Sequence, residues 1–369
     1  MTVEPSDIPP PLALIAELTH RCPLRCLYCS NPLDLVRRGE ELSTDNWCAI
    51  LDEAADMGIV QVHFTGGEPA ARDDLEVLVG RAEDRGMYVN LITSAVALDG
   101  DRLRRLNERG LSHVQISFQG ADEETAASIA GFDGGHDQKC RIARQVRELD
   151  MALTVNAVIH RSNMDQVPEL IQLALDLDAQ RLEIANVQYY GWALANRETL
   201  LPTRAQAEAV AKTVEQERLR LKGRLVIDHV APDYYARRPK ACMGGWGRQS
   251  LNIMPDGRVL PCHAAATIPE LAFERAGDRP LLDIWRHGAA FERFRGTQWM
   301  AEPCRSCPDR EVDWGGCRCQ ALALTGNTQA TDPACELAPY HHLMAQLAGD
   351  QTGAYTGSVR YRSMSGKSD

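Results

Sequence analysis

Short apolar runs alternate with amphipathic helical patterns from residue 12 to about residue 190, and this alternation constrains the fold more than any other feature. Repeated strand–helix units predict an α/β fold with a parallel sheet and right-handed crossovers. Such a sheet is either doubly wound or curved into a barrel, and the periodicity does not choose between them. The expected strands are residues 12–18, 59–64, 87–93, 113–118, 152–159 and 181–187.

The helices expected between these strands each carry one apolar face. The faces are formed by Trp47, Ile50, Leu51 and Ala54; by Leu75, Leu78, Val79 and Ala82; by Ile142, Val146 and Leu149; and by Val167, Leu170, Ile171 and Ala174. Gly58 and Gly86 follow the first two faces and predict where those helices end. A charged, alanine-rich helix is expected over residues 203–222, followed by an edge strand over residues 225–230.

A loop directly after the first expected strand carries three cysteines, Cys22, Cys26 and Cys29, in a C-x3-C-x2-C spacing. In α/β proteins the loops at the carboxyl ends of strands carry the functional residues. A cubic iron–sulfur cluster normally takes four cysteines, so three thiolates would leave one iron open to another ligand. Taken alone, the spacing also fits a zinc knuckle or three thiols without a joint role.

A second motif, Thr-Gly-Gly-Glu-Pro at residues 65–69, follows the next expected strand. Gly66 and Gly67 let the backbone approach a ligand closely, Glu68 offers an acceptor for an amino group, and Pro69 fixes the turn. By itself this motif is an ordinary turn between a strand and a helix. Each motif alone is ambiguous, but the two motifs on successive strand ends, in this order, are together highly specific for one class of functional site.

These two motifs, with the aromatic Tyr28 before the last thiol, resemble the radical S-adenosylmethionine (SAM) superfamily. The resemblance implies that the three cysteines bind a [4Fe–4S] cluster whose open iron is chelated by the amine and carboxylate of SAM. It implies that Gly66, Gly67 and Glu68 contact SAM. It also favours a partial (β/α)6 barrel that is open on one side to admit a large substrate.

Polar residues at later strand ends are further candidates for the SAM site. Ser117 and Gln119 end the fourth expected strand, and the resemblance suggests that they lie near the SAM ribose, as does Asn156 in the fifth. Gln119 stands where similar family members carry an acid, which keeps a hydrogen bond but removes a charge. The alternative is that Ser117 and Asn156 only satisfy the local backbone.

The composition changes after the expected edge strand and predicts a second, smaller domain. Residues 1–11 are expected to form a tail, 12–231 the core, 232–241 a linker, 242–345 a cysteine-rich domain and 346–369 a disordered tail. Asp256 and Gly257 predict a hairpin turn, and residues 281–294 predict a helix. The domain carries seven of the twelve cysteines: Cys242, Cys262, Cys304, Cys307, Cys317, Cys319 and Cys335.

One or two structural zinc sites would account for these spacings. Downstream of a radical SAM core, however, the pattern resembles the SPASM extension, which holds two auxiliary iron–sulfur clusters. Asp313 stands where that layout has a cysteine, and a carboxylate there is a harder ligand that should change the cluster's potential. The resemblance assigns Cys242, Cys262, Cys317 and Cys319 to the first cluster, and Cys304, Cys307, Asp313 and Cys335 to the second.

The layout with Asp313 and Cys319 is similar to the maturases of pyrroloquinoline quinone (PQQ) biosynthesis. This implies a carbon–carbon crosslink between a glutamate and a tyrosine side chain in a precursor peptide, PqqA, presented by a peptide chaperone, PqqD, with an electron donor such as flavodoxin. One alternative is another SPASM-type peptide-modifying enzyme, such as a sulfatase maturase or a thioether-forming enzyme. The other is a zinc-stabilised peptide-binding module. No residue is identified as a general base.

Charge and hydropathy exclude several other classes of function. The net charge is −11 and no sustained basic stripe is present, which argues against a nucleic-acid partner. No apolar run approaches the ~18 residues of a membrane span, and residues 1–11 lack the features of a signal peptide. A cytoplasmic location is therefore expected, where twelve cysteines argue for metal binding or catalysis rather than disulfides.

Overall fold

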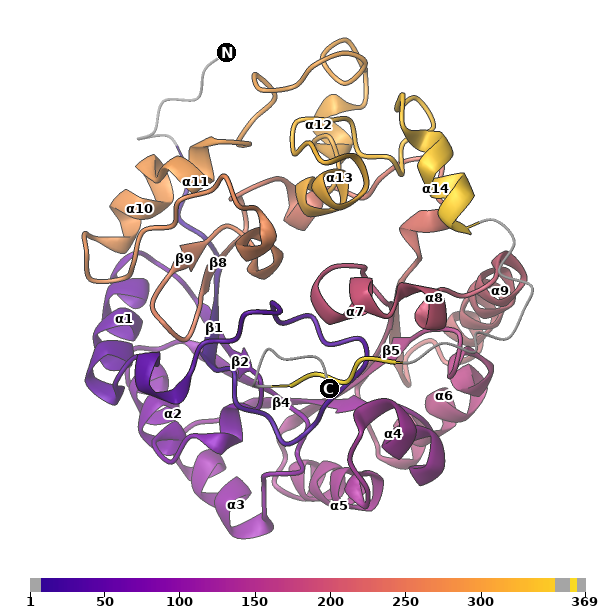
Figure 1. Ribbon diagram of the computed structural model, residues 1–369. Coiled ribbons are helices and arrows are strands. Elements are labelled where there is room, and N and C mark those ends of the chain that lie inside the picture. Colours follow the sequence, from indigo (N-terminus) through magenta and orange to yellow (C-terminus); the bar gives the residue numbers. More distant parts are fainter. Residues whose placement is uncertain (1–7, 349–358, 364–369) are drawn as a thin grey trace.

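A single curved sheet of nine strands, with helices outside it, organises the computed structural model, which describes residues 8–348 and 359–363 (Figure 1). The sheet has the strand order β7-β6-β5-β4-β3-β2-β1-β8-β9. Its strands are β1 (Ala13–Thr19), β2 (Gln61–Gly66), β3 (Tyr88–Thr93), β4 (His113–Phe118), β5 (Ala152–Ile159), β6 (Arg181–Asn186), β7 (Val226–Val230), β8 (Ser250–Ile253) and β9 (Val259–Leu260).

The strand order decides between the two arrangements that the sequence left open. In a doubly wound sheet the strand order reverses at a switch point. Here β1 to β7 follow one another in sequence order, and each pairs in parallel with the next. The expected partial barrel is therefore confirmed, and the carboxyl ends of its strands meet at one mouth.

Most helices of the core cover the outside of the barrel, whereas the short α7 lies inside the ring of helices (Figure 1). They are α1 (Thr44–Asp56), α2 (Leu75–Asp84), α3 (Gly100–Glu108), α4 (Glu123–Ala130), α5 (Gly135–Glu148), α6 (Val167–Asp176), α7 (Gly191–Ala195), α8 (Arg197–Leu200) and α9 (Arg204–Arg220). Helix α1 begins where the Ser43 side chain accepts a hydrogen bond from the Asn46 backbone, and it buries the apolar face expected from its sequence. The apolar faces expected for α2 and α6 are buried as well.

The cysteine-rich half is joined to the core through the sheet. Strand β8 pairs in parallel with β1, with Leu251 opposite Leu14, and β9 returns antiparallel after the Asp256–Gly257 turn, so the expected hairpin is confirmed. The single helix expected over residues 281–294 is wrong, because the backbone becomes extended at Gly288 and divides it. The helices of this half are α10 (Leu281–His287), α11 (Ala289–Glu292), α12 (Arg310–Asp313), α13 (Arg318–Thr325) and α14 (His341–Ala348).

The end of the chain differs from the disordered tail expected after residue 345. Residues 349–358 and 364–369 lie outside the described part, but α14 extends to Ala348 and residues 359–363 pack on the barrel mouth. The backbone N–H of Arg362 donates to the carbonyl of Arg25, and Asn196 Nδ2 donates to the carbonyl of Arg360 at 2.8 Å. These five residues are called the C-terminal segment below, and Figure 1 shows them in yellow.

No helix within the described residues is long and apolar enough to cross a membrane.

Candidate functional site

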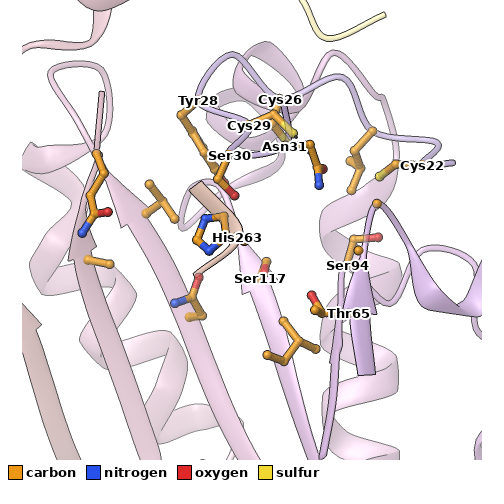
Figure 2. A pocket seen from close by; sticks show the side chains of 18 of the residues that line it. Cys22, Cys26, Tyr28, Cys29, Ser30, Asn31, Thr65, Ser94, Ser117 and His263 are labelled. Atoms are coloured by element: carbon orange, nitrogen blue, oxygen red, sulfur yellow. Dashed lines mark hydrogen bonds between the residues drawn. The ribbon is translucent and has the colours of Figure 1, made fainter. Parts of the chain in front are cut away.

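A cavity of about 480 Å³ opens at the carboxyl ends of the barrel strands. Figure 2 shows the thiols of Cys26 and Cys29 above the strand ends that carry Ser117 and Thr65, with Cys22 at one side. Eight of the nine residues expected at the catalytic cluster and SAM line this one cavity, namely Cys22, Cys26, Cys29, Gly66, Gly67, Ser117, Gln119 and Asn156. The fold therefore brings together residues from four separate strand ends.

The loop of residues 20–31, which we call the cluster loop, is held in place by buried leucine side chains and by hydrogen bonds to its backbone and to His20. Leu24 and Leu27 are buried, and the Arg25 backbone N–H donates to the Ala130 carbonyl at 2.7 Å. The His20 side chain is fully buried and its Nδ1 accepts from the Val36 backbone at 2.9 Å. These contacts fix the loop's backbone while leaving its thiols directed into the cavity.

Burial raises the pKa of all three thiols of the cluster loop. The pKa of Cys26 rises to about 12, and the pKa values of Cys22 and Cys29 are also raised, in each case chiefly through desolvation. The thiols are thus protonated in the metal-free chain at neutral pH, and a metal centre would have to displace those protons. Three close thiols on one cavity wall have the donor chemistry that an iron–sulfur cluster needs.

The glycines of the second motif hold the cluster loop at close range. The Gly67 backbone N–H donates to the Thr19 carbonyl at 2.5 Å, and the Glu68 backbone donates to the Arg21 carbonyl at 2.7 Å. A Cβ atom on Gly67 would lie only 2.4 Å from the Arg21 carbonyl oxygen. Gly66 has a φ of +132°, which favours glycine, and its Cβ would meet the Thr19 carbonyl. Both glycines therefore serve loop packing and line the cavity.

The Glu68 side chain has a different position from the one expected. It is fully buried and does not line the cavity. Its Oε1 accepts from the Ala70 backbone and the Thr93 hydroxyl, and its Oε2 accepts from the backbone and hydroxyl of Ser94. The carboxylate thus ties the end of β3 to the motif, and the acceptor for an amino group expected on this side chain is already occupied.

Gln119, directly after β4, is joined to the cluster loop and to a buried lysine, whereas Asn156 on β5 bonds to the neighbouring strand β6. Gln119 Nε2 donates to the Tyr28 hydroxyl at 3.1 Å, and its Oε1 accepts from the ammonium of Lys139. Asn156 Nδ2 donates to Glu183 Oε2 at 2.8 Å. Lys139 lies on α5, is 1% exposed, and its pKa is lowered by burial. Sequence reasoning missed Lys139, because a lysine within an amphipathic helix normally faces solvent.

Two further residues separate the cavity from the cysteine-rich half. Tyr190 and His263 both line the cavity, and the Tyr190 hydroxyl is 2.5 Å from His263 Nε2. Tyr190 also packs in one buried group with Cys262 and Cys319. A single layer of side chains therefore lies between the cavity and these thiols.

The thiols assigned to the first auxiliary cluster interact chiefly with one another. The pKa values of Cys242 and Cys319 are raised and those of Cys262 and Cys317 are lowered, in each case chiefly through the neighbouring thiols of this group. Cys262 follows β9, whereas Cys317 and Cys319 lie at the start of α13. Four thiols that influence one another's pKa, all expected to act together, have the donor set of a fully cysteine-ligated cluster.

The second group of expected ligands combines three thiols with the carboxylate of Asp313. Burial, followed by the nearby charges of Asp313 and Cys335, raises the pKa of Cys304. Arg238 Nη1 lies 3.8 Å from the sulfur of Cys307 and 3.9 Å from that of Cys335. Asp313 is buried at the end of α12, where its Oδ1 accepts from the Gly315 backbone at 2.8 Å.

Neither group has the close geometry of a single-ion site. Among the described residues, no set of three histidine, cysteine, aspartate or glutamate side chains is arranged to hold one metal ion. Within each group the thiols nevertheless interact with one another. A cluster of several irons also occupies more space than one zinc ion. Their donor sets fit such a cluster, with one carboxylate in the second group.

Two family models match the chain, one over the cluster loop and the other over four of the seven cysteines of the cysteine-rich half. The Radical SAM superfamily matches residues 16–174, and an iron–sulfur cluster-binding domain, SPASM, matches residues 242–308. A protein of Bradyrhizobium diazoefficiens named PqqA peptide cyclase is 56% identical over 357 residues, covering 96% of this chain and 94% of that protein. A PqqA peptide cyclase of Granulibacter bethesdensis is 55% identical over 341 residues, covering 92% and 91%.

Solved structures of radical SAM enzymes share the fold at low sequence identity. Streptococcus suis SuiB bound to its precursor peptide SuiA has a TM-score of 0.72 at 20% identity, covering 89% of this chain and 76% of that one. The enzyme anSMEcpe with bound AdoMet has a TM-score of 0.65 at 17% identity, covering 91% and 96%. These likenesses support the barrel with its cysteine-rich extension as the architecture of the chain.

Proposed function

The chain belongs to the PqqA peptide cyclases, radical SAM enzymes with a SPASM domain, and from this we propose that it joins a glutamate to a tyrosine side chain within PqqA. The enzyme modifies the precursor peptide PqqA in PQQ biosynthesis, and it uses SAM, a [4Fe–4S] cluster and auxiliary iron–sulfur clusters. The carbon–carbon crosslink and the residues that carry it are the proposal.

The observation that carries the proposal is one cavity that three thiols and several polar strand ends share. Cys22, Cys26 and Cys29 hold the catalytic cluster in this scheme. The residues that receive SAM are Gly66, Gly67, Ser117, Gln119 and Asn156, whereas Glu68 supports them from behind. The auxiliary ligands are Cys242, Cys262, Cys317 and Cys319 for one cluster, and Cys304, Cys307, Asp313 and Cys335 for the other.

When bound, SAM and the catalytic cluster supply a 5′-deoxyadenosyl radical, which removes one hydrogen atom from the glutamate side chain. The carbon radical then adds to the tyrosine ring, which must lose one proton and one electron to become aromatic again. Tyr190 and His263 lie between the cavity and the first thiol group, on the side toward which that electron would leave.

Two further partners belong to the proposal. PqqD presents the PqqA peptide at the barrel mouth, and a one-electron donor such as flavodoxin reduces the catalytic cluster. Support for a peptide substrate is that the cavity opens at the mouth of an incomplete barrel, which leaves room for a chain rather than only a small molecule.

The first test measures 5′-deoxyadenosine release by the anaerobically purified, reduced protein with SAM. Cys26→Ala should abolish release, because it removes a ligand of the catalytic cluster. Cys48→Ala is the matched control, since Cys48 lies on α1 outside the cavity and should leave release unchanged. Release that survives in Cys26→Ala would rule out the assignment of these thiols.

The second test identifies the product. PqqA incubated with PqqD, SAM, reductant and the enzyme should lose a pair of hydrogen atoms and acquire a bond between a glutamate and a tyrosine, as read by tandem mass spectrometry. A thioether, or an altered cysteine or serine, would instead indicate another peptide-modifying reaction.

A further inference from the structure

The C-terminal segment carries a buried arginine into the site. Besides its bonds with Asn196, the segment is attached near the cluster loop: the Arg362 backbone bonds to the Arg25 carbonyl, Arg25 Nε donates back to the Arg362 carbonyl at 3.3 Å, and the Tyr361 hydroxyl donates to the Ser128 carbonyl at 2.8 Å. The Arg25 guanidinium also lies over the Tyr361 ring. These contacts fix the segment against the cluster loop from the side opposite the sheet.

The side chain of Arg362 is 3% exposed and lines the cavity. Its guanidinium donates to the His20 carbonyl, its positive charge lowers the pKa of the Cys29 thiol, and its Nε has no hydrogen-bond partner. Its positive charge also acts on the thiols of Cys22 and Cys26, lowering the pKa that burial raises. The guanidinium therefore interacts with all three thiols of the cluster loop.

The burial of this charge needs an explanation. No carboxylate among the described residues forms an ion pair with Arg362, although a buried guanidinium without a counter-charge costs several kcal/mol. The negative charge within reach is that of the cluster-loop cysteines, which are anionic only when they bind metal. The arginine is thus placed for a thiolate-ligated cluster rather than for the metal-free chain.

We propose that Arg362 is a positioning residue of the catalytic site, whose buried positive charge in the same cavity as Cys22, Cys26 and Cys29 raises the reduction potential of the cluster on the cluster loop. Hydrogen bonds to the sulfurs, net charge and solvent exposure are the quantities that set such potentials. The inference rests on the proposed role of Cys22, Cys26 and Cys29 as cluster ligands.

The step concerned is a one-electron reduction in which no bond forms or breaks. One electron passes from an external reductant to the cluster, whose core charge falls from 2+ to 1+. A fixed positive charge beside the sulfurs stabilises the reduced, more negative state relative to the oxidised one. The C-terminal segment would thereby ease electron uptake, which a cluster with three thiolates otherwise resists.

The experiment is a redox titration followed by electron paramagnetic resonance, using the full-length, cluster-loaded protein. The catalytic cluster is identified as the signal that changes when SAM is added. Arg362→Gln should shift its midpoint potential to more negative values, and Arg362→Lys, which keeps the charge but loses the planar fork, should shift it less. Arg360→Gln is the matched control, because Arg360 lies in the same segment but is exposed, and it should leave the potential unchanged.

The possible outcomes distinguish an effect of Arg362 on the reduction potential of the cluster from a purely structural role. A fully loaded Arg362→Gln protein with the wild-type potential overturns the proposal, as does an equal shift in Arg360→Gln. If Arg362→Gln loses iron, the midpoint potentials of Arg362→Lys and Arg360→Gln are compared in the same way. A purely structural role for Arg362 predicts less iron but an unchanged potential. If the wild-type protein has no SAM-responsive signal, the assignment of the cluster to Cys22, Cys26 and Cys29 is contradicted. If the signal is present, a negative result with the Arg362 variants overturns only the proposal for Arg362.

Discussion

Gln119 Nε2 donates a hydrogen bond to the hydroxyl of Tyr28 at 3.1 Å, which ties the end of β4 to the cluster loop. The same amide accepts from the buried ammonium of Lys139 through its oxygen. One side chain thus bridges a strand end, the loop that carries the thiols and a cation on α5. The amide suits this position because it donates on one side and accepts on the other.

Replacing Gln119 tests this bridge. Gln119→Leu leaves the Lys139 ammonium buried without its acceptor and should lower stability by about 2 kcal/mol. Gln119→Glu keeps an acceptor for Lys139, and the Tyr28 hydroxyl can donate to the new carboxylate, so it should remain close to the wild type. Anaerobic thermal unfolding of the three proteins measures the difference, and equal midpoints would show that the bridge contributes nothing.

Gly67→Ala should displace the cluster loop, because the new Cβ would lie 2.4 Å from the Arg21 carbonyl oxygen and 2.6 Å from that of His20. Both neighbours are backbone atoms and cannot turn aside. We expect the protein to lose iron from the catalytic cluster while the auxiliary clusters remain, as read from iron content and from the SAM-responsive resonance signal. Gly39→Ala is the control, since nothing lies within 4 Å of a Cβ at that position. Full iron loading in Gly67→Ala would contradict the packing role.

His160 should make the fold less stable in mild acid. Burial lowers the pKa of His160 to about 3, and its Nε2 has no hydrogen-bond partner. An unfolded histidine has a pKa of ~6.5, so the stability contribution is complete above that pH and is lost as the pH falls from there toward 3. The expected loss is about 1.4 kcal/mol for each pH unit in that window.

The corresponding measurement compares unfolding midpoints at pH 7.5 and pH 5.5. His160→Asn should have a lower midpoint than the wild type at pH 7.5, because its ring contact with Tyr28 is lost. Its midpoint should nevertheless fall less between the two pH values. The exposed His342, replaced by asparagine, controls for the removal of a histidine in general. An equal acid-induced fall in His160→Asn and the wild type would refute the assignment.

Asp313 tests the role of the second auxiliary group. Asp313→Ala removes the carboxylate and should reduce crosslinked peptide per 5′-deoxyadenosine by about tenfold or more. Release of 5′-deoxyadenosine itself should continue, because that reaction takes place at the cluster loop. Asp313→Cys restores a thiolate donor and should retain the cluster with an altered resonance spectrum. An unchanged spectrum in both variants would exclude Asp313 as a ligand.

The sequence predicted the barrel well because its strands are buried and their pattern is local. Strands β4 and β5 begin and end at the expected residues, and the other core strands shift by one or two residues at their ends. Helices α3 and α4 were missed, since α3 buries only Leu103 and Leu106 and α4 is short. Such short apolar faces give little periodic signal.

The site was predicted where residues share a motif and missed where the fold alone unites them. The thiols of the cluster loop follow from spacing, but Lys139 reaches the site from the inner face of a helix. Arg362 lies more than three hundred residues away in the chain from His20, whose carbonyl it contacts. Nothing local distinguishes it from Arg360, which is exposed two residues earlier.

The pairing of β8 with β1 has a consequence for the timing of catalysis. Strand β1 runs directly into the cluster loop, and β8 leads through β9 to Cys262, so the catalytic and the first auxiliary groups are attached to neighbouring strands of one sheet. A hinge between the two halves would have to break that ladder of backbone hydrogen bonds. In the proposed reaction, the distance that an electron would cross from the peptide to the first auxiliary group therefore stays the same throughout turnover, and the chemistry of the peptide, rather than domain closure, would decide when the electron leaves.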